Sequence, residues 1–329
     1  MTVIGDGAWG TALALVLHDN NFRVTIWSHD ATYAETVNHT HENSKFLPGV
    51  TLPESLTVSS DMAGAVSDSH LLVMAAPTQF VRSVSERLAP CYPKGVPVLS
   101  VAKGIERETL LRPSQIIREV VGRSAPLAVL SGPSHAEEVA RKMPTSVSVA
   151  SNNFQLAVLV QDAFTTSYFR PYTTNDVAGV ELGGALKNVI GIASGILDGL
   201  GAGDNAKSAL ITRGLAEITR LGVALGARRS TFAGLSGIGD LITTCISPHG
   251  RNHRCGYEIG RGKTLQQFLD STEQAIEGVW TCQSVRQLAA RHDVEMPICE
   301  QVYQVLFNNK PPASAINDLM TRQTRQEED

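Results

Sequence analysis

The chain of 329 residues has few aromatic residues, little net charge and few cysteines. Aromatic residues make up 5% of it, so its core must be built from aliphatic side chains. A formal net charge of -4 argues against a nucleic-acid partner, whose binding would need an excess of Lys and Arg. The five cysteines include no Cys-x-x-Cys pair. They suit neither a disulfide framework nor a zinc site, so we expect no metal and a reducing, cytoplasmic compartment.

A long uninterrupted apolar run is also missing. The most apolar stretch, residues 180–200, is broken by Lys187, Asn188 and Asp198, so we expect no membrane span. Glycine, in contrast, is abundant, with 28 residues, and it permits close approaches between backbones. The length of the chain favours two domains.

Short β-branched runs alternate with helical patterns in the first half of the chain. This alternation predicts a mostly parallel sheet covered by helices on both faces, which is an α/β, doubly wound, Rossmann-type domain. After residue 174 only helical patterns follow, so we expect domains at 1–174 and 175–329, the second of them all helical. The predicted strands are residues 2–4, 22–27, 56–59, 70–75, 97–101, 127–130, 145–150 and 168–171, and three predicted helices are 11–18, 79–88 and 154–164.

The N-terminal turn reads Gly5-Asp6-Gly7-Ala8-Trp9-Gly10 and matches the G-x-G-x-x-G pattern. Between a strand and a helix, these glycines permit a tight turn, a close approach to a pyrophosphate and close strand–helix packing. The turn therefore predicts that a dinucleotide, NAD or NADP, binds here. The strand before it is unusually short, with three residues after Met1.

The end of the second predicted strand bears on the choice of cofactor. NAD-specific enzymes place a carboxylate there, which binds the ribose 2′-hydroxyl. The strand ends in Trp27-Ser28-His29-Asp30. With His29 at that place NADP is tolerated or preferred, whereas with Asp30 NAD is preferred; we favour His29.

Three unusual loops follow the fourth, fifth and sixth predicted strands, at residues 75–77, 101–104 and 131–134. Ligands of doubly wound sheets bind beyond the carboxyl ends of the strands. Taken alone, Lys103 reads as a surface lysine, and Pro and Gly occur in loops everywhere. The shared position of the loops predicts that Lys103 and Ser134 face the cofactor or the substrate.

Residues 180–197 form a helical pattern with two distinct faces. One face is aliphatic, and the other gathers Gly184, Gly191 and Gly195 around Lys187 and Asn188. A glycine-rich face indicates that another part of the protein or a ligand approaches it closely. One interpretation is that a neighbouring helix packs on this face and that Lys187 reaches outward to solvent. The other is that the face borders a confined site in which Lys187 exchanges protons.

Two further segments carry polar residues next to turns. Asp240 follows a Gly-x-Gly turn and reads either as a helix N-cap or as a site acid. Arg251 and Asn252 follow Gly250 at an apparent helix start, where a guanidinium and an amide suit a phosphate. The alternative for Arg251 is an ordinary surface arginine.

Together these segments resemble the NAD(P)-dependent glycerol-3-phosphate dehydrogenase family, in its bacterial form, over essentially the whole chain. The resemblance rests on the glycine turn with Trp9, VAKGI at 101–105, LSGPSHA at 130–136, ELGGALKN at 181–188, GIGDL at 237–241, GRN at 250–252 and AIEG at 275–278. Two positions depart from the family's pattern: Gly250 stands where bacterial relatives often have Ser, and Asp6 where a small apolar residue is usual.

The resemblance implies a cytosolic homodimer that interconverts dihydroxyacetone phosphate and sn-glycerol 3-phosphate with NAD or NADP, supplying the phospholipid backbone. It implies that Lys187 is the proton donor and acceptor, with Lys103 and Asp240 orienting and tuning it. The implied substrate residues are Lys103, Gly132, Ser134, Asn188, Asp240, Thr244, Arg251 and Asn252. The implied cofactor residues are Gly5, Gly7, Trp9, Gly10, His29, Lys103, Ala136, Arg251 and Glu277.

Two other functions remain open at this point. A reductase of a non-phosphorylated hydroxy acid would share the two-domain layout but would not need Arg251 and Asn252. A non-catalytic NAD(P)-binding sensor would keep the glycine turn and would not depend on Lys187.

Overall fold

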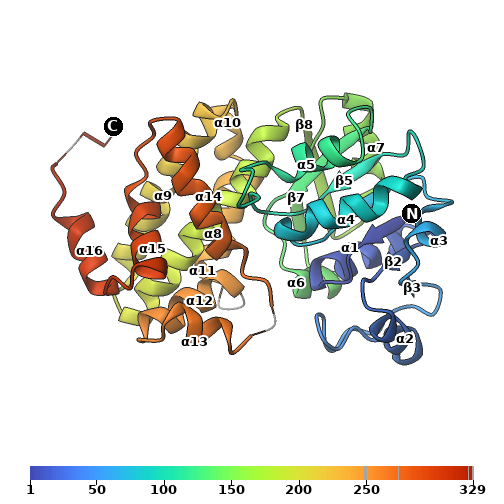
Figure 1. Cartoon of the computed structure of the whole chain (residues 1–329), viewed down its shortest axis with the longest axis horizontal. Helices are drawn as coiled ribbons and strands as arrows, with labels where there is room; N and C mark the ends of the chain where they lie inside the picture. The colour runs from blue at the N-terminus through green and yellow to red at the C-terminus, as the bar shows by residue number, and fades with distance from the viewer. Residues whose placement is uncertain (248–249, 273, 325, 328–329) are drawn as a thin grey trace.

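The computed structural model describes residues 1–247, 250–272, 274–324 and 326–327. An eight-stranded sheet with helices on both faces forms the N-terminal part, and a group of helices forms the C-terminal part (Figure 1). The last strand ends at Thr174, and the first helix of the C-terminal part begins at Val177. The predicted fold class is confirmed.

The strands lie in the order β3-β2-β1-β4-β5-β6-β7-β8. Neighbours are parallel except β6 and β7, which are antiparallel, so the sheet is mostly parallel, as predicted. The strands are β1 (Thr2–Ile4), β2 (Thr25–Trp27), β3 (Thr57–Ser59), β4 (Leu72–Met74), β5 (Val98–Ser100), β6 (Leu127–Ser131), β7 (Thr145–Ala150) and β8 (Phe169–Thr174). β2 starts later than predicted because its register begins with Thr25 opposite Thr2, the first residue of β1.

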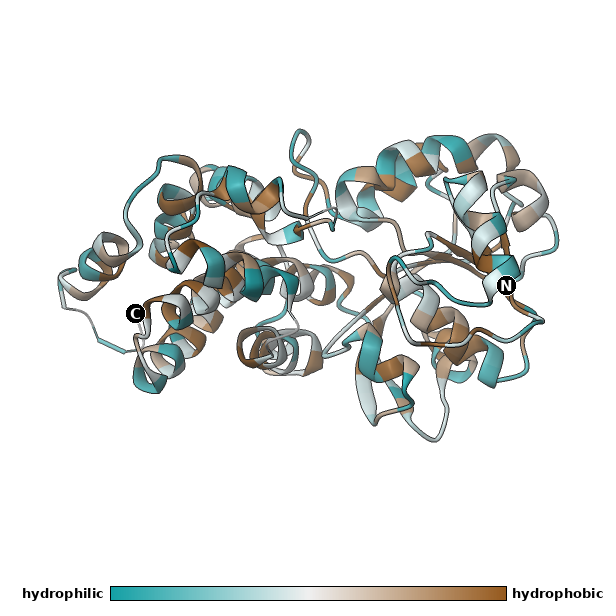
Figure 2. Cartoon of the chain, turned by 90° about the horizontal axis from the view of Figure 1, so that it is seen from below, coloured by the Kyte–Doolittle hydropathy of each residue, from teal (hydrophilic) through white to brown (hydrophobic). Residues whose placement is uncertain are grey.

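Aliphatic residues fill both faces of the sheet, as the low aromatic content requires. The strands are coloured as hydrophobic in Figure 2. Helices α1 (Ala8–Asp19), α6 (Ala136–Ala140) and α7 (Phe154–Phe164) supply one core, and α3 (Met62–Val66), α4 (Val81–Leu88) and α5 (Pro113–Val120) supply the other. Helix α1 begins inside the glycine turn, three residues earlier than predicted. Helix α2 (Ala31–Thr40) follows β2.

The C-terminal part is built around α8 (Val177–Leu200) (Figure 1). By length and composition this helix could cross a membrane, but its apolar window is entirely buried inside the protein. No strand follows β8 in the described part of the chain. The surrounding helices are α9 (Asp204–Ala224), α10 (Arg229–Phe232), α11 (Asp240–Ile246), α12 (Arg251–Gly260), α13 (Leu265–Leu269), α14 (Glu277–Arg291), α15 (Pro297–Phe307) and α16 (Pro312–Met320).

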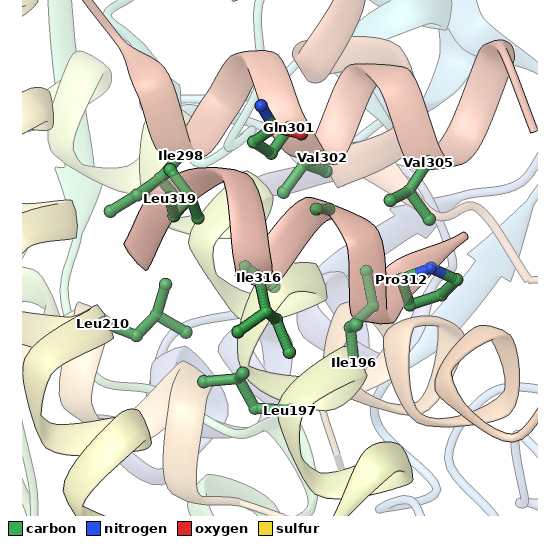
Figure 3. A pocket seen from close by; sticks show the side chains of 12 residues that line it. Ile196, Leu197, Leu210, Ile298, Gln301, Val302, Val305, Pro312, Ile316 and Leu319 are labelled. Carbon is green, nitrogen blue, oxygen red and sulfur yellow. The ribbon is translucent and has the colours of Figure 1, made fainter. Parts of the chain in front are cut away.

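An apolar crevice lies where α8, α9, α15 and α16 meet (Figure 3). Its walls are formed by Ile196 and Leu197 on α8 and by Ile316 on α16, and Gln301 is the polar residue among those that line it. None of the predicted site residues lines this crevice. Its lining residues include no group suited to acid–base chemistry, so the crevice is not a candidate active site.

Candidate active site

The loops after β5 and β6 meet at one edge of the sheet, because these neighbouring strands are parallel. Lys103 Nζ donates to the Gly132 carbonyl at 2.8 Å and to Ser134 Oγ at 3.2 Å. Gly132 has a φ of +147°, and a Cβ there would lie 2.9 Å from the Cα of Val147. Only glycine fits this turn, and the turn presents its carbonyl oxygen to Lys103.

Asp240 joins two lysines from different parts of the fold. Its Oδ1 lies 2.9 Å from Lys187 Nζ, and its Oδ2 lies 2.9 Å from Lys103 Nζ. Asp240 is the first residue of α11, and the N-cap of that helix is Gly239. The N-cap interpretation is therefore wrong, and the carboxylate contacts the two lysines instead.

The three charged groups are mostly removed from water: Lys187 is 7% exposed and Asp240 is 2% exposed. Thr244 Oγ1 accepts a further hydrogen bond from Lys187 Nζ at 2.6 Å. Burial lowers the pKa of Lys103 to about 8, with Asp240 opposing and Lys187 adding to that shift. When both lysines are charged, one carboxylate faces two cations. The cluster then carries a net positive charge that suits an anionic ligand.

The glycine face of α8 serves both purposes that the sequence left open. A Cβ on Gly195 would lie 2.0 Å from the His253 carbonyl oxygen, so the backbone of α12 packs directly against this face. A Cβ on Gly191 would lie 2.6 Å from Cγ2 of Thr244, on α11. Close helix packing therefore explains these glycines. Lys187 does not reach outward from this packing but points into the buried cluster with Asp240.

A chain of amide hydrogen bonds connects the sheet to the helical part. Asn188 Nδ2 donates to the Lys103 carbonyl at 2.8 Å, and its Oδ1 accepts from Asn252 Nδ2 at 3.0 Å. Asn252 Oδ1 in turn accepts from the backbone N–H of Gly278 at 2.9 Å. The chain fixes α8, α12 and α14 relative to the loop that carries Lys103.

Arg251 lies at the first turn of α12 and is exposed. It forms no ion pair with any residue that the structure describes. The N-cap of this helix is Gly250, which has no side chain to bond the first N–H groups. A cation thus stands beside a helix N-terminus that has no side-chain cap, and both favour a negatively charged group.

Glu277 lies where α14 meets the loop after β4. Its Oε1 accepts from the backbone N–H of Thr78 at 2.7 Å. Burial raises the pKa of Glu277 to about 7, opposed by the hydrogen bonds from Thr78 and by the charge of Arg251. Thr78 is not among the predicted site residues, although it directly follows the unusual loop at 75–77.

The glycine turn has the shape that a dinucleotide requires. A Cβ on Gly10 would lie 2.3 Å from the Gly5 carbonyl oxygen, and Gly5 has a φ of +121°, so both positions need glycine. A Cβ on Gly7 would meet nothing within 4 Å, and Gly7 gives α1 no side-chain cap. A helix start without a side-chain cap, next to open space, fits a pyrophosphate.

The remaining predicted cofactor residues lie around this turn and the neighbouring strand ends. Trp9 is on the first turn of α1, and its Nε1 is buried without a partner among the described residues. Ala136 begins α6, and His29 is exposed just beyond β2. Asp30, the alternative to His29, caps α2 by accepting from the backbone N–H of Tyr33 at 3.0 Å.

Two further polar groups were not among the predicted site residues. His135 lies within the segment at 130–136, and its Nε2 is buried without a partner among the described residues. Burial and the charge of Lys187 lower the pKa of His135. Glu181, at the start of α8, accepts from Ser114 N at 2.8 Å and from Arg112, which ties α8 to α5. Such contacts between distant segments leave no local pattern in a sequence.

Comparisons with known proteins agree with this geometry. A family model described as the NAD-dependent glycerol-3-phosphate dehydrogenase N-terminus matches residues 1–157, and that of the C-terminus matches residues 176–317. A glycerol-3-phosphate dehydrogenase [NAD(P)+] from Geobacillus thermodenitrificans is 50% identical, over 99% of this chain and 96% of the relative.

Solved structures give the same result. A glycerol-3-phosphate dehydrogenase from Coxiella burnetii has a TM-score of 0.94 and 36% identity, with 98% of each chain covered. A D-mandelate dehydrogenase with NADH reaches a TM-score of 0.64 at 13% identity, covering 98% of this chain and all of the other, and shares the fold alone. The chain therefore belongs to the NAD-dependent glycerol-3-phosphate dehydrogenase family.

Proposed function

We propose that this protein is a glycerol-3-phosphate dehydrogenase that uses NAD(P) and interconverts dihydroxyacetone phosphate and sn-glycerol 3-phosphate. The observation that carries the proposal is the Lys187–Asp240–Lys103 cluster, which lies at the sheet edge used for ligands by this fold. The product class, a phosphorylated triol, is the backbone of glycerophospholipids.

Lys187 is the proposed acid and base. Its ammonium group is held by Asp240 and Thr244, so its protons point in fixed directions. It donates a proton to the oxygen of the substrate ketone, and in the reverse direction it accepts that proton. The nicotinamide, when bound, supplies or accepts the hydride. Asp240 keeps Lys187 in place and balances its charge, and Lys103 holds the other oxygen of that carboxylate.

The substrate's phosphate is assigned to the start of α12. Arg251 provides a guanidinium that can bind two phosphate oxygens, and Asn252 continues the amide chain toward Lys103. Binding energy gained at the phosphate then fixes the ketone carbon, which lies at the other end of the molecule. Gly132, Ser134 and Asn188 complete the proposed substrate site beside Lys103.

The cofactor is assigned to the glycine turn and the strand ends beside it. Gly5, Gly7 and Gly10 shape the pyrophosphate site, and Trp9 and Ala136 lie at the first turns of the two helices that flank it. Further proposed contacts, which follow the family resemblance, come from His29, Lys103, Arg251 and Glu277.

Neither alternative function, the NAD(P)-binding sensor or the reductase of a non-phosphorylated hydroxy acid, is supported by an observation in the structure. A sensor without chemistry would have no use for two buried lysines on one carboxylate, which is a costly arrangement. A reductase of non-phosphorylated hydroxy acids shares the fold only distantly and would leave Arg251 without a purpose.

We also propose a cytoplasmic homodimer with a domain boundary after residue 174. All five cysteines are free, which suits a reducing compartment. The boundary is supported by the change from strand to helix between Thr174 and Val177, and the dimer by the family resemblance.

Oxidation of NADH and of NADPH, followed by absorbance with dihydroxyacetone phosphate as substrate, tests the proposed reaction. We expect turnover with dihydroxyacetone phosphate. With unphosphorylated dihydroxyacetone, kcat/KM should be lower by at least about a hundredfold, because this substrate lacks the phosphate that forms charge-assisted hydrogen bonds. Equal kcat/KM for the two substrates would contradict the proposal.

A further inference from the structure

Asp6, the acid inside the glycine turn, lies against the end of β2. The N–H of Gly5 donates to the Trp27 carbonyl at 3.0 Å, which holds the turn and the strand end together. The Asp6 carbonyl accepts from Asn43 Nδ2 at 2.7 Å and from Thr11 Oγ1 at 3.3 Å. The backbone of Asp6 is therefore fixed on both sides.

The side chain of Asp6 is fixed as well. Its Oδ2 accepts from Ser28 Oγ at 2.6 Å, and Ser28, the first residue after β2, is fully buried. Asp6 itself is 8% exposed and forms no ion pair within the described part of the chain. An uncompensated carboxylate thus stands where the second strand ends.

The other groups at this strand end are less suited to that role. The Asp30 carboxylate is engaged as the N-cap of α2 through Tyr33, and both Asp30 and His29 are exposed. A carboxylate at the end of β2 is what NAD-binding domains use for the ribose 2′-hydroxyl. Here that carboxylate comes from the turn and not from the strand.

We propose that Asp6 is the residue that selects between the two cofactors and that it favours NADH over NADPH. The ribose hydroxyl of NADH can donate to Asp6 Oδ1, while Oδ2 stays with Ser28. The 2′-phosphate of NADPH brings further negative charge toward a buried carboxylate, where repulsion is screened weakly. This inference rests on the NAD(P) site of the proposed function and adds the specificity of that site.

Asp6→Asn tests the proposal because asparagine keeps the shape and can still accept from Ser28, so that only the charge is removed. The matched control is Asp30→Asn, since asparagine caps helices as well as aspartate does. NADH and NADPH are titrated against each protein without substrate, and binding is followed by nicotinamide fluorescence. The ratio of the two Kd values is independent of the fraction of protein that is folded.

We expect wild type to bind NADPH about tenfold or more weaker than NADH, and Asp6→Asn to reduce that ratio by about tenfold. Asp30→Asn should leave the ratio within about twofold, because its carboxylate caps a helix at the surface. With dihydroxyacetone phosphate as substrate, the ratio of kcat/KM for NADH to kcat/KM for NADPH should also fall in Asp6→Asn. This change should come from the KM values for the two cofactors and not from kcat.

An unchanged ratio in Asp6→Asn would overturn the inference while leaving the dehydrogenase proposal intact. A larger shift in Asp30→Asn would overturn it in favour of Asp30. If wild type bound neither nucleotide, the cofactor site of the proposed function would fail, and this inference with it.

Discussion

The proposed site has two halves that differ in how far the protein satisfies its own polar groups. In the closed half, Lys103, Lys187, Asp240 and Thr244 hydrogen-bond one another and are largely buried. In the open half, Gly7 gives the first turn of α1 no side-chain cap, and the exposed guanidinium of Arg251 forms no ion pair in the described part of the chain.

This difference shows which half of the site has a fixed geometry before any ligand binds. Removing one member of a buried ion pair leaves an uncompensated charge and costs roughly 3–5 kcal/mol. The closed half therefore has a fixed geometry in the free protein, as a proton-transferring group needs. The open half gains its hydrogen bonds only from ligands, so changes there should weaken binding and leave folding and proton transfer in place.

The strongest test of this division is Lys187→Ala. Loss of a positioned acid should lower kcat by about 10²–10⁴ and change the KM for dihydroxyacetone phosphate much less. Steady-state kinetics measure both values. Lys263→Ala, which removes a half-exposed lysine paired with Glu258, should retain wild-type kcat. If kcat of Lys187→Ala stayed within threefold of wild type, Lys187 would not be the acid of the reaction.

A smaller effect, on binding, is expected for Arg251→Ala. A charge-assisted contact of about 1.5–3 kcal/mol corresponds to a rise in KM of about 10–150-fold. The kcat should stay within a few-fold of wild type because Arg251 does not touch the reacting carbon. Arg254→Ala, an exposed arginine one turn further along α12, is the matched control. A loss of kcat without a change in KM would place Arg251 in the closed half instead.

The smallest effect concerns pH. Lys103, with a pKa lowered to about 8, is charged below that pH and neutral above it. Above pH 8 the site loses positive charge, so kcat/KM for the anionic substrate should fall by about tenfold per pH unit. Lys103→Arg keeps its charge throughout this range. The pH profile of kcat/KM for Lys103→Arg should therefore show no decrease above pH 8, whatever the absolute activity of the variant. If the decrease persisted, it would arise from the titration of another group.

The sequence was a good guide to the fold because short β-branched runs between helical patterns mark the strands of a mostly parallel sheet. All eight strands lie where such runs predicted them, and differences are confined to their ends. The meeting of Lys103 with Ser134 also followed from local information, since the carboxyl ends of parallel strands share one edge.

The partners of the glycines in α8 could not be predicted. The pattern of one helix reveals a face that is closely approached, but it does not say by what. Gly195 is approached by the backbone of α12. Lys187, two turns earlier on the same helix, forms an ion pair with Asp240. The contacts of Asp6 with Ser28 and of Glu181 with Ser114 join segments far apart in the chain, for which local patterns carry no signal.

The burial of α8 has a consequence for synthesis of the protein. The helices that cover it, α9, α11, α12, α14 and α15, all follow it in the chain, and the last of them ends at Phe307, 107 residues after Leu200 (307 minus 200). At roughly 5–20 residues per second, translation of those residues takes roughly 5–21 seconds. During that time the 24-residue apolar helix is only partly covered by its later helices. A nascent chain in this state depends on chaperones or on early contacts with the finished sheet to avoid aggregation.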